Sequence, residues 1–401
     1  MIPNPTLFPL VHFADTHRGQ VMAKRLVVHA GFFKTGTTAL QTSFIHHREE
    51  LLSHNILYPK LGATGQHRAA WALSGRHWGW ENQGGKVTPR SVWDNIIKEL
   101  NAYPETALLS SEFLAELLPE HIDSMKNDIK ADATTIVFTL RPLVKMLASQ
   151  YQQSLKYGMR IDYSEWLDRV LNDKTETIQN QTFWRRHHHP SVIERWVRVF
   201  GARAVTVIVG DETEPDFIFK SFNDDVLKLQ ERILTQIPES GLNRSLTWPE
   251  IQLLIEINKK YDREKGWDEY TTMVRNGIFR NLSNTEANPD DERLLTPRWA
   301  IQKSQAFATK FVSQIRDLDV TIIGNLDEIA TATVAEGENE PTKGMNFQDV
   351  ATIVLMRSQT EILSEIPGQD LRRELIKRLK IRKNPFLRLG LRIYGLIRRI
   401  R

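Results

Sequence analysis

The chain of 401 residues contains no cysteine. It therefore has no disulfide framework, no cysteine-ligated zinc site and no thiol nucleophile, and this composition suits a reducing compartment. The sequence also lacks an apolar run as long as a membrane-spanning helix, and its first residues lack the basic segment and apolar core of a secretory signal. We therefore predict a soluble, cytoplasmic protein.

Acidic residues are scarce at the end of the chain. The segment from Leu371 to Arg401 holds twelve lysines or arginines and one acid, Glu374. The net charge of the whole chain is +4, so the residues before this segment have a net charge of about −7. Apolar residues alternate with these arginines, as they do in helices at a membrane surface. Two interpretations remain open: peripheral contact with an anionic membrane, or a helix packed on the body with its arginines in solvent.

Hydrophobic residues make up 41% of the chain, which is enough for a large core. The predicted parts are an irregular leader at 1–24, an α/β domain at 25–330, a polar loop or linker at 331–345, and a helical, basic extension at 346–401.

Strand and helix patterns alternate at 26–52, 106–118 and 134–157, and residues 319–324 add a further strand candidate. Each alternation suits a βαβ-type connection. We predict the α/β class, with a central, mainly parallel sheet flanked by helices, a P-loop-like core and helical C-terminal additions.

A glycine-containing turn at 31–38 connects the first strand pattern to a helix pattern. Such a turn aims unpaired backbone N–H groups at one point, where the helix dipole adds partial positive charge. A lysine adds a full charge and three threonines add hydroxyls. The residues of this predicted phosphate cradle are Lys34, Thr35, Gly36, Thr37 and Thr38.

The turn differs from the Walker A pattern, in which the lysine directly follows the second glycine. Thr37 occupies that place here, and Lys34 precedes Gly36 by two residues. The turn therefore does not fit an ordinary P-loop kinase or ATPase.

A second candidate phosphate site follows the strand pattern at 134–140. Arg141 stands at the strand end and Ser149 lies eight residues later, slightly over two helical turns away, so that Ser149 shares a face with the helix start. An arginine fork and a hydroxyl together suit a phosphate monoester. The alternative is an arginine in a surface salt bridge and a serine without a role.

Together, these two motifs resemble the nucleotide-binding motifs of the sulfotransferases that use 3′-phosphoadenosine 5′-phosphosulfate (PAPS), in particular bacterial ones. The turn at 34–38 resembles the 5′-phosphosulfate loop, and Arg141 with Ser149 resembles the pair that holds the 3′-phosphate. The familiar form has an aspartate between the arginine and the proline, whereas Arg141 abuts Pro142 here. The resemblance spans roughly residues 25–260. It implies in-line transfer of a sulfuryl group from PAPS, the co-substrate, to a hydroxyl of a carbohydrate, lipid or small molecule.

This reaction needs charge stabilisation and a base for the acceptor proton. Lys34 is the candidate for the first role. His67 at a loop–helix junction is a candidate base, because histidine titrates near neutrality, although a lone histidine is more often structural. Glu112, just past the strand pattern at 106–111, is the competitor, and the sequence also allows it a simple role at a helix N-terminus.

Tryptophan is concentrated in one region. Four of the ten tryptophans lie between Trp71 and Trp93. Their flat faces suit an acceptor pocket, but core packing or an oligomer interface would use them equally well. We expect no metal ion, since a sulfuryl group carries less charge than a phosphoryl group and the consecutive side chains of 187–189 rarely converge on one ion.

Two rival functions remain. An atypical P-loop kinase would need Mg²⁺ and a carboxylate at a strand end, for which Asp211 is the candidate. A non-enzymatic protein would bind a membrane surface or nucleic acid through the basic tail. The sulfotransferase prediction itself involves no nucleic acid.

Overall fold

A computed structural model gives the structure of the chain for residues 25–60, 65–80, 82–172, 174–211, 213–238, 244–287, 289–342, 346–348, 350–351 and 354–355. The predicted leader and the basic tail lie outside the described residues. The predicted division into 25–330, 331–345 and 346–401 stays a prediction.

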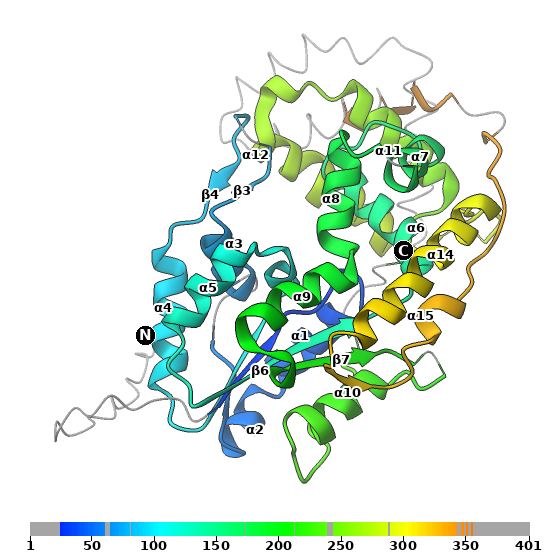
Figure 1. The fold of residues 1–401 in the computed structure, drawn as a ribbon. Helices are drawn as coiled ribbons and strands as arrows, with labels where there is room; N and C mark the ends of the chain where they lie inside the picture. The colour runs from blue at the N-terminus through cyan, green and yellow to red at the C-terminus, as the bar shows by residue number, and fades with distance from the viewer. Residues whose placement is uncertain are drawn as a thin grey trace, which may run out of the picture.

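Six parallel strands form the central sheet, in the order β2-β5-β1-β6-β7-β8 (Figure 1). Their bounds are β1 Arg25–His29, β2 Ile56–Leu57, β5 Thr106–Ser110, β6 Ala133–Leu140, β7 Val205–Val209 and β8 Thr321–Ile323. The prediction of an α/β fold with a mainly parallel sheet is confirmed, and β8 confirms the strand at 319–324. Strand β1 lies in the interior of the sheet, between β5 and β6.

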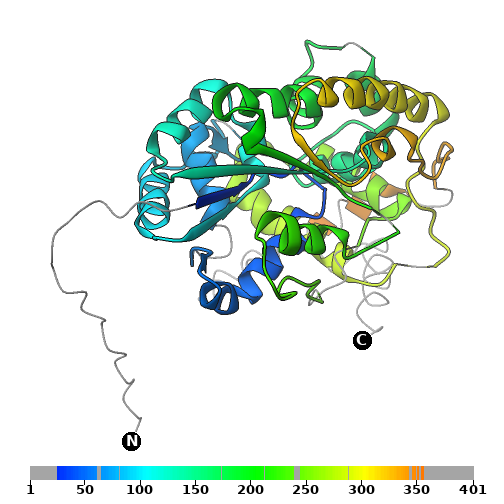
Figure 2. The same ribbon diagram turned by 60° about the horizontal axis from the view of Figure 1, so that its bottom comes forward.

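Both faces of the sheet are covered by helices, which explains why its strands are continuously apolar. Along β1, Val27 belongs to one buried cluster, whereas Leu26 and Val28 belong to another. On the Val27 face pack α1 (Thr37–His46), α2 (Arg48–Ser53) and α10 (Phe217–Ser221) (Figure 2). On the other face pack α3 (Gly65–Ser74), α4 (Ser91–Ala102), α5 (Pro119–Asp128) and α9 (His189–Phe200).

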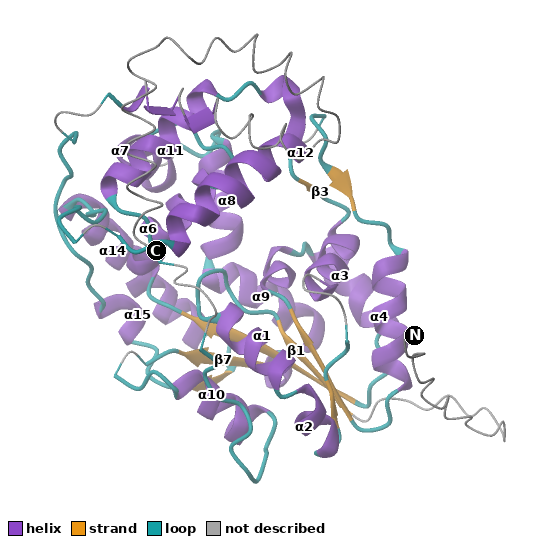
Figure 3. Ribbon diagram, turned by 180° about the vertical axis from the view of Figure 1, so that it is seen from behind, coloured by secondary structure: helices purple, strands orange, loops and turns teal. Residues whose placement is uncertain are grey.

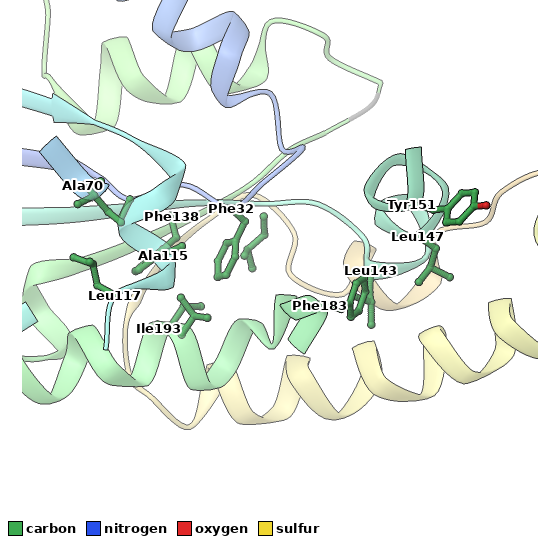
Figure 4. Close-up of a cluster of buried hydrophobic side chains, with 14 of the residues drawn as sticks. Phe32, Ala70, Ala115, Leu117, Phe138, Leu143, Leu147, Tyr151, Phe183 and Ile193 are labelled. Atoms are coloured by element: carbon green, nitrogen blue, oxygen red, sulfur yellow. The ribbon is translucent and has the colours of Figure 1, made fainter. Parts of the chain in front are cut away.

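A second helical layer gathers beyond one end of the strands (Figure 3). It contains α6 Leu143–Leu155, α7 Tyr163–Leu171, α8 Ile178–His187, α11 Trp248–Lys260, α12 Gly266–Tyr270, α13 Arg280–Asn284, α14 Arg298–Arg316 and α15 Glu328–Thr331. Its buried residues share one cluster with the sheet. Figure 4 shows this continuity, from Phe32 and Phe138 at the sheet to Leu147 and Tyr151 on α6 and Phe183 on α8.

Short elements complete the structure. They are the hairpin β3 (His77–Trp78) and β4 (Lys86–Val87), the 3₁₀ turns η1 (Glu112–Glu116), η2 (Ala202–Ala204) and η4 (Arg263–Lys265), and the π-helices η3 (Phe222–Val226) and η5 (Thr271–Phe279). The helix predicted at the end of the 106–118 alternation is the 3₁₀ turn η1 instead. Ser111 caps it by accepting from the Phe113 amide at 3.3 Å, and Pro119 starts a separate helix, α5. No helix among the described residues is long and apolar enough to cross a membrane.

Candidate active site

Three adjacent strands end at the same edge of the sheet. Because β5, β1 and β6 are parallel neighbours, the residues that follow their carboxyl ends come together there. Glu112 follows β5, Lys34 lies in the turn after β1, and Arg141 follows β6 directly. The structure thus brings these three sequence-predicted residues to one edge.

The turn after β1 has the backbone geometry of an anion cradle. Lys34 and Gly36 adopt left-handed conformations, with φ of 65° and 85°, and Gly36 is the N-cap of α1. The first helical bond runs from the Leu40 amide to the Gly36 carbonyl at 3.1 Å. The amides of residues 36–39 donate to no described residue, so they are available to an anionic ligand.

The structure divides the three threonines of the turn. The hydroxyls of Thr35 and Thr37 are buried and donate to the Phe32 carbonyl, at 2.7 and 3.1 Å. Thr35 also lies 2.7 Å from the hydroxyl of Thr139 on β6. These two side chains therefore shape the turn, while Thr38 is exposed. Whether Thr35 and Thr37 also contact a nucleotide stays a prediction.

A buried histidine, which was not selected from the sequence, lies directly before the turn. His29, at the end of β1, is 2.9 Å from the Ser110 hydroxyl on β5 and 3.4 Å from the Thr139 hydroxyl on β6. Burial lowers its pKa to about 3, so the imidazole is neutral. A Cβ atom on Gly31 would lie 2.5 Å from His29 Nε2, which explains the glycine. The only sequence signal for His29 is a polar residue inside an apolar strand.

Lys34 extends from this turn, and its side chain is exposed. Desolvation by the surrounding protein lowers its pKa, Arg141 lowers it further, and Glu112 raises it. An Arg141 Nη donates to the Lys34 carbonyl at 3.3 Å, which connects the β1 and β6 edges. Lys34 thus belongs to the same turn as the unpaired amides of residues 36–39.

His67 and Glu112, the two candidate bases, lie side by side. His67 is the third residue of α3, and its Nδ1 is 2.9 Å from the Ser111 hydroxyl and 3.6 Å from a Glu112 carboxylate oxygen. Gln41 on α1 donates to the same carboxylate oxygen at 3.1 Å. Nδ1 thus faces its orienting partners, and Nε2 makes no hydrogen bond with a described residue. This geometry suits a base with an attached orienting group.

Arg141 and Ser149 are not joined by a contact in the structure. Arg141 is partly exposed after β6, and Ser149 is partly exposed on α6. Their joint role as a 3′-phosphate receptor stays a prediction.

The predicted tryptophan cluster separates into two groups. Trp93 is fully buried and donates to Asp128 at 2.8 Å, and Trp80 donates to the Tyr157 carbonyl at 3.0 Å, so both are structural. Trp71 and Trp78, in contrast, stack with ring centroids 4.0 Å apart. Trp71 is also 6.3 Å from the His67 ring, which extends this stack to the candidate base.

Lys156 lies near Lys34 and Arg275 lies near Lys156, and neither residue was assigned a role from the sequence. Lys156 follows α6, and its pKa is lowered to about 8 by burial and by the charges of Lys34 and Arg275. Arg275 lies on the π-helix η5. No spacing pattern links residue 275 to Lys156, and only the tertiary structure brings them close.

The remaining candidates are less suited to chemistry. Asp211 is partly exposed beyond β7, where its carboxylate accepts from the amide and hydroxyl of Thr213, at 2.7 and 2.6 Å. His187 and His189 are fully buried. Among the described residues, no three histidine, aspartate or glutamate side chains are grouped as they would be around a metal ion.

No protein-family model and no curated protein sequence matches the chain. Among solved structures, the "Crystal Structure of Sulfotransferase from Alicyclobacillus acidocaldarius" is similar to it, with a TM-score of 0.37 and 14% sequence identity. The alignment covers 74% of this chain and 95% of that chain. This likeness is too distant to define either the fold or the function.

Proposed function

We propose that the protein is a sulfotransferase that moves a sulfuryl group from PAPS to an acceptor hydroxyl. The observation that carries the proposal is the juxtaposition at one sheet edge. Lys34 and the unpaired amides of α1 form an anion cradle, and the His67–Glu112 pair lies beside it. Cradle and base are the two parts that transfer to a hydroxyl requires.

In the proposed reaction, the acceptor oxygen attacks sulfur in line with the leaving group. A new oxygen–sulfur bond forms, and the bond from sulfur to the 5′-phosphate oxygen breaks, which releases adenosine 3′,5′-bisphosphate. His67 Nε2 takes the acceptor proton. Because Glu112 lies 3.6 Å from Nδ1, its carboxylate stabilises the imidazolium that results. Lys34 and the amides stabilise charge on the transferring and leaving oxygens.

The proposal also assigns residues to the 3′-phosphate of the nucleotide. Arg141 is tied to the backbone of Lys34, so a 3′-phosphate bound by Arg141 and Ser149 would fix the nucleotide relative to the cradle. The acceptor is a carbohydrate, lipid or small molecule whose ring lies against Trp71 and Trp78. A cytoplasmic location and contact of the basic extension with anionic membranes remain further parts of the proposal.

The first prediction concerns nucleotide choice. Adenosine 3′,5′-bisphosphate should bind much more tightly than AMP or ATP, without Mg²⁺. Arg141→Ala should weaken its binding by roughly 1.5–3 kcal/mol, the range for a hydrogen bond to a charged group. Isothermal titration calorimetry measures both effects, and radiolabelled PAPS with a panel of hydroxyl acceptors tests transfer directly.

The matched control is Arg198→Ala, which replaces an arginine with a 69% exposed side chain on α9. It should bind the bisphosphate like the unmodified protein. ATP binding as tight as that of the bisphosphate, and only with Mg²⁺, would support the kinase instead. The position of Asp211, whose carboxylate is engaged by Thr213, does not favour that rival.

The second prediction separates binding from chemistry at Lys34. If the ammonium stabilises charge that develops in the transition state, Lys34→Ala should lower kcat by roughly 10²–10³. Its effect on bisphosphate affinity should be smaller. Single-turnover transfer assays and calorimetry give the two quantities.

The control for this variant is Lys310→Ala, which removes an exposed lysine of α14. It should leave both quantities unchanged. If Lys34→Ala weakens bisphosphate binding strongly but leaves kcat intact, Lys34 serves only to bind the nucleotide.

A further inference from the structure

Arg275 is held by aromatic rings and has no polar partner in the described part of the chain. Its guanidinium carbon is 4.9 Å from the ring centroid of Tyr157, 5.2 Å from that of Trp78 and 6.0 Å from that of Trp267. It makes no hydrogen bond and no ion pair with any described residue. The rings fix the orientation of the side chain, and its five N–H donors stay available to a ligand.

Two acidic side chains lie in this region, Glu112 near Lys34 and Glu116 near Tyr157, and both are already engaged. Glu112 accepts from Gln41 and faces His67. Glu116, whose side chain is only 8% exposed, is shared by three other arginines at 2.9–3.3 Å. These are Arg76, Arg185 and Arg186. The region therefore carries more positive charge than its carboxylates neutralise, which favours an anionic ligand.

Lys156 connects Arg275 to the cradle. The charges of both Lys34 and Arg275 act on Lys156, whose ammonium lies 4.3 Å from the Phe279 ring. Arg141 acts on Lys34, while Arg275 acts on Lys156. We assign Arg275 to the acceptor because Trp78, on which its guanidinium rests, stacks on Trp71 beside the candidate base.

An aromatic path joins Arg275 to the candidate base. The His67 ring neighbours Trp71, Trp71 stacks on Trp78, and Trp78 lies under the Arg275 guanidinium. Phe113 contacts both His67 and Trp78, with its ring centroid 5.3 Å from that of His67 and 5.9 Å from that of Trp78. A ring-bearing molecule on this surface would have His67 near one end and Arg275 near the other.

We propose that Arg275 binds an anionic group of the acceptor, a carboxylate, sulfate or phosphate, so that the protein acts on ring-bearing acceptors that carry a negative charge as well as a hydroxyl. The inference rests on the proposed function for the role of His67. The anion site itself follows from the contacts of Arg275 and does not depend on the donor.

The binding experiment compares two probes that differ in one charge, 4-hydroxybenzoate and its neutral methyl ester. Calorimetry is performed with the full chain in saturating adenosine 3′,5′-bisphosphate, so that the cradle is occupied. The acid should bind at least roughly tenfold more tightly than the ester, as expected for a charged hydrogen bond. Phenyl sulfate and phenyl phosphate, titrated in the same way, identify the preferred anion.

Two substitutions test whether Arg275 causes the preference for the acid over the ester. Arg275→Met keeps the apolar stem and should abolish the preference for the acid, whereas Arg275→Lys keeps the charge without the planar fork and should retain part of it. Bisphosphate affinity should stay within about twofold in both. Arg280→Met, which replaces an exposed arginine of α13, is the control and should keep the full preference. Circular dichroism confirms that each variant is folded.

The outcomes separate this inference from the proposed function. Equal binding of acid and ester by the unmodified protein would overturn it, and so would a loss of bisphosphate affinity in Arg275→Met, which would assign Arg275 to the nucleotide. If PAPS is no donor but the acid is still preferred through Arg275, the proposed function fails and the anion site stands. If PAPS is a donor and the acid is not preferred, only the anion site fails.

Discussion

His67→Ala is expected to lower kcat by roughly 10²–10⁴, the usual contribution of general acid–base catalysis, and to leave bisphosphate binding nearly intact. The reason is the geometry of the imidazole. Nδ1 faces Ser111 and Glu112, while Nε2 makes no hydrogen bond within the described part of the chain. Steady-state assays with radiolabelled PAPS measure the turnover, and calorimetry measures the binding.

Glu112→Gln distinguishes the two candidate bases. If His67 is the base, the amide keeps the shape of the pair and loses only the stabilisation of the imidazolium, so Glu112→Gln should retain more activity than His67→Ala. His54→Ala replaces an exposed histidine and serves as the control. Near-normal turnover in His67→Ala beside an inactive Glu112→Gln would identify Glu112 as the base.

The second large effect is loss of stability in acid. Burial lowers the pKa of His29 and His189 to about 3 and that of His187 well below its ordinary value. Below pH 6.5 the unfolded chain therefore binds protons that the folded chain does not. For each unit by which the pH falls below 6.5, each histidine lowers the free energy of unfolding by up to about 1.4 kcal/mol, and the three together lower it by about 4 kcal/mol. Above pH 6.5 these groups contribute no pH dependence.

A typical stability of about 5–15 kcal/mol would then be lost within a few pH units below neutrality. Urea unfolding at several pH values measures the slope. His189→Leu should reduce this slope by the contribution of one histidine, because both ring nitrogens of His189 are buried without a partner among the described residues. His54→Gln should keep the original slope. An unchanged slope in His189→Leu would show that this histidine is protonated in the folded protein.

The sheet and the cradle could be predicted from the sequence because their signals are local. The strand pattern of residues 26–30 is apolar except for His29 and is followed at once by glycine, and the next helix begins at Thr37. Parallel strands buried on both faces carry this continuous signal. The structure confirms the fold class, while the roles of Lys34 and Arg141 stay predictions.

The contacts of Arg275 with Trp78 and Tyr157 could not be predicted, because these residues come from distant segments of the chain. Trp78 lies on a hairpin, Tyr157 follows α6, and Arg275 lies on a π-helix. None of these residues is near another in the sequence, and no periodicity marks their contact. The neutral state of His29 was equally hidden, since it results from burial between two neighbouring strands.

The left-handed backbone of Lys34 has a consequence for engineering. Glycine or asparagine tolerates a φ of 65° more easily than lysine, whose Cβ makes this conformation cost about 1–2 kcal/mol. A search for thermostable variants would therefore favour glycine at this position, and the same substitution would remove the charge of the cradle. If Lys34 has the proposed role, stability and activity select opposite residues at position 34, and a library screened for heat resistance alone would lose the charge of this turn.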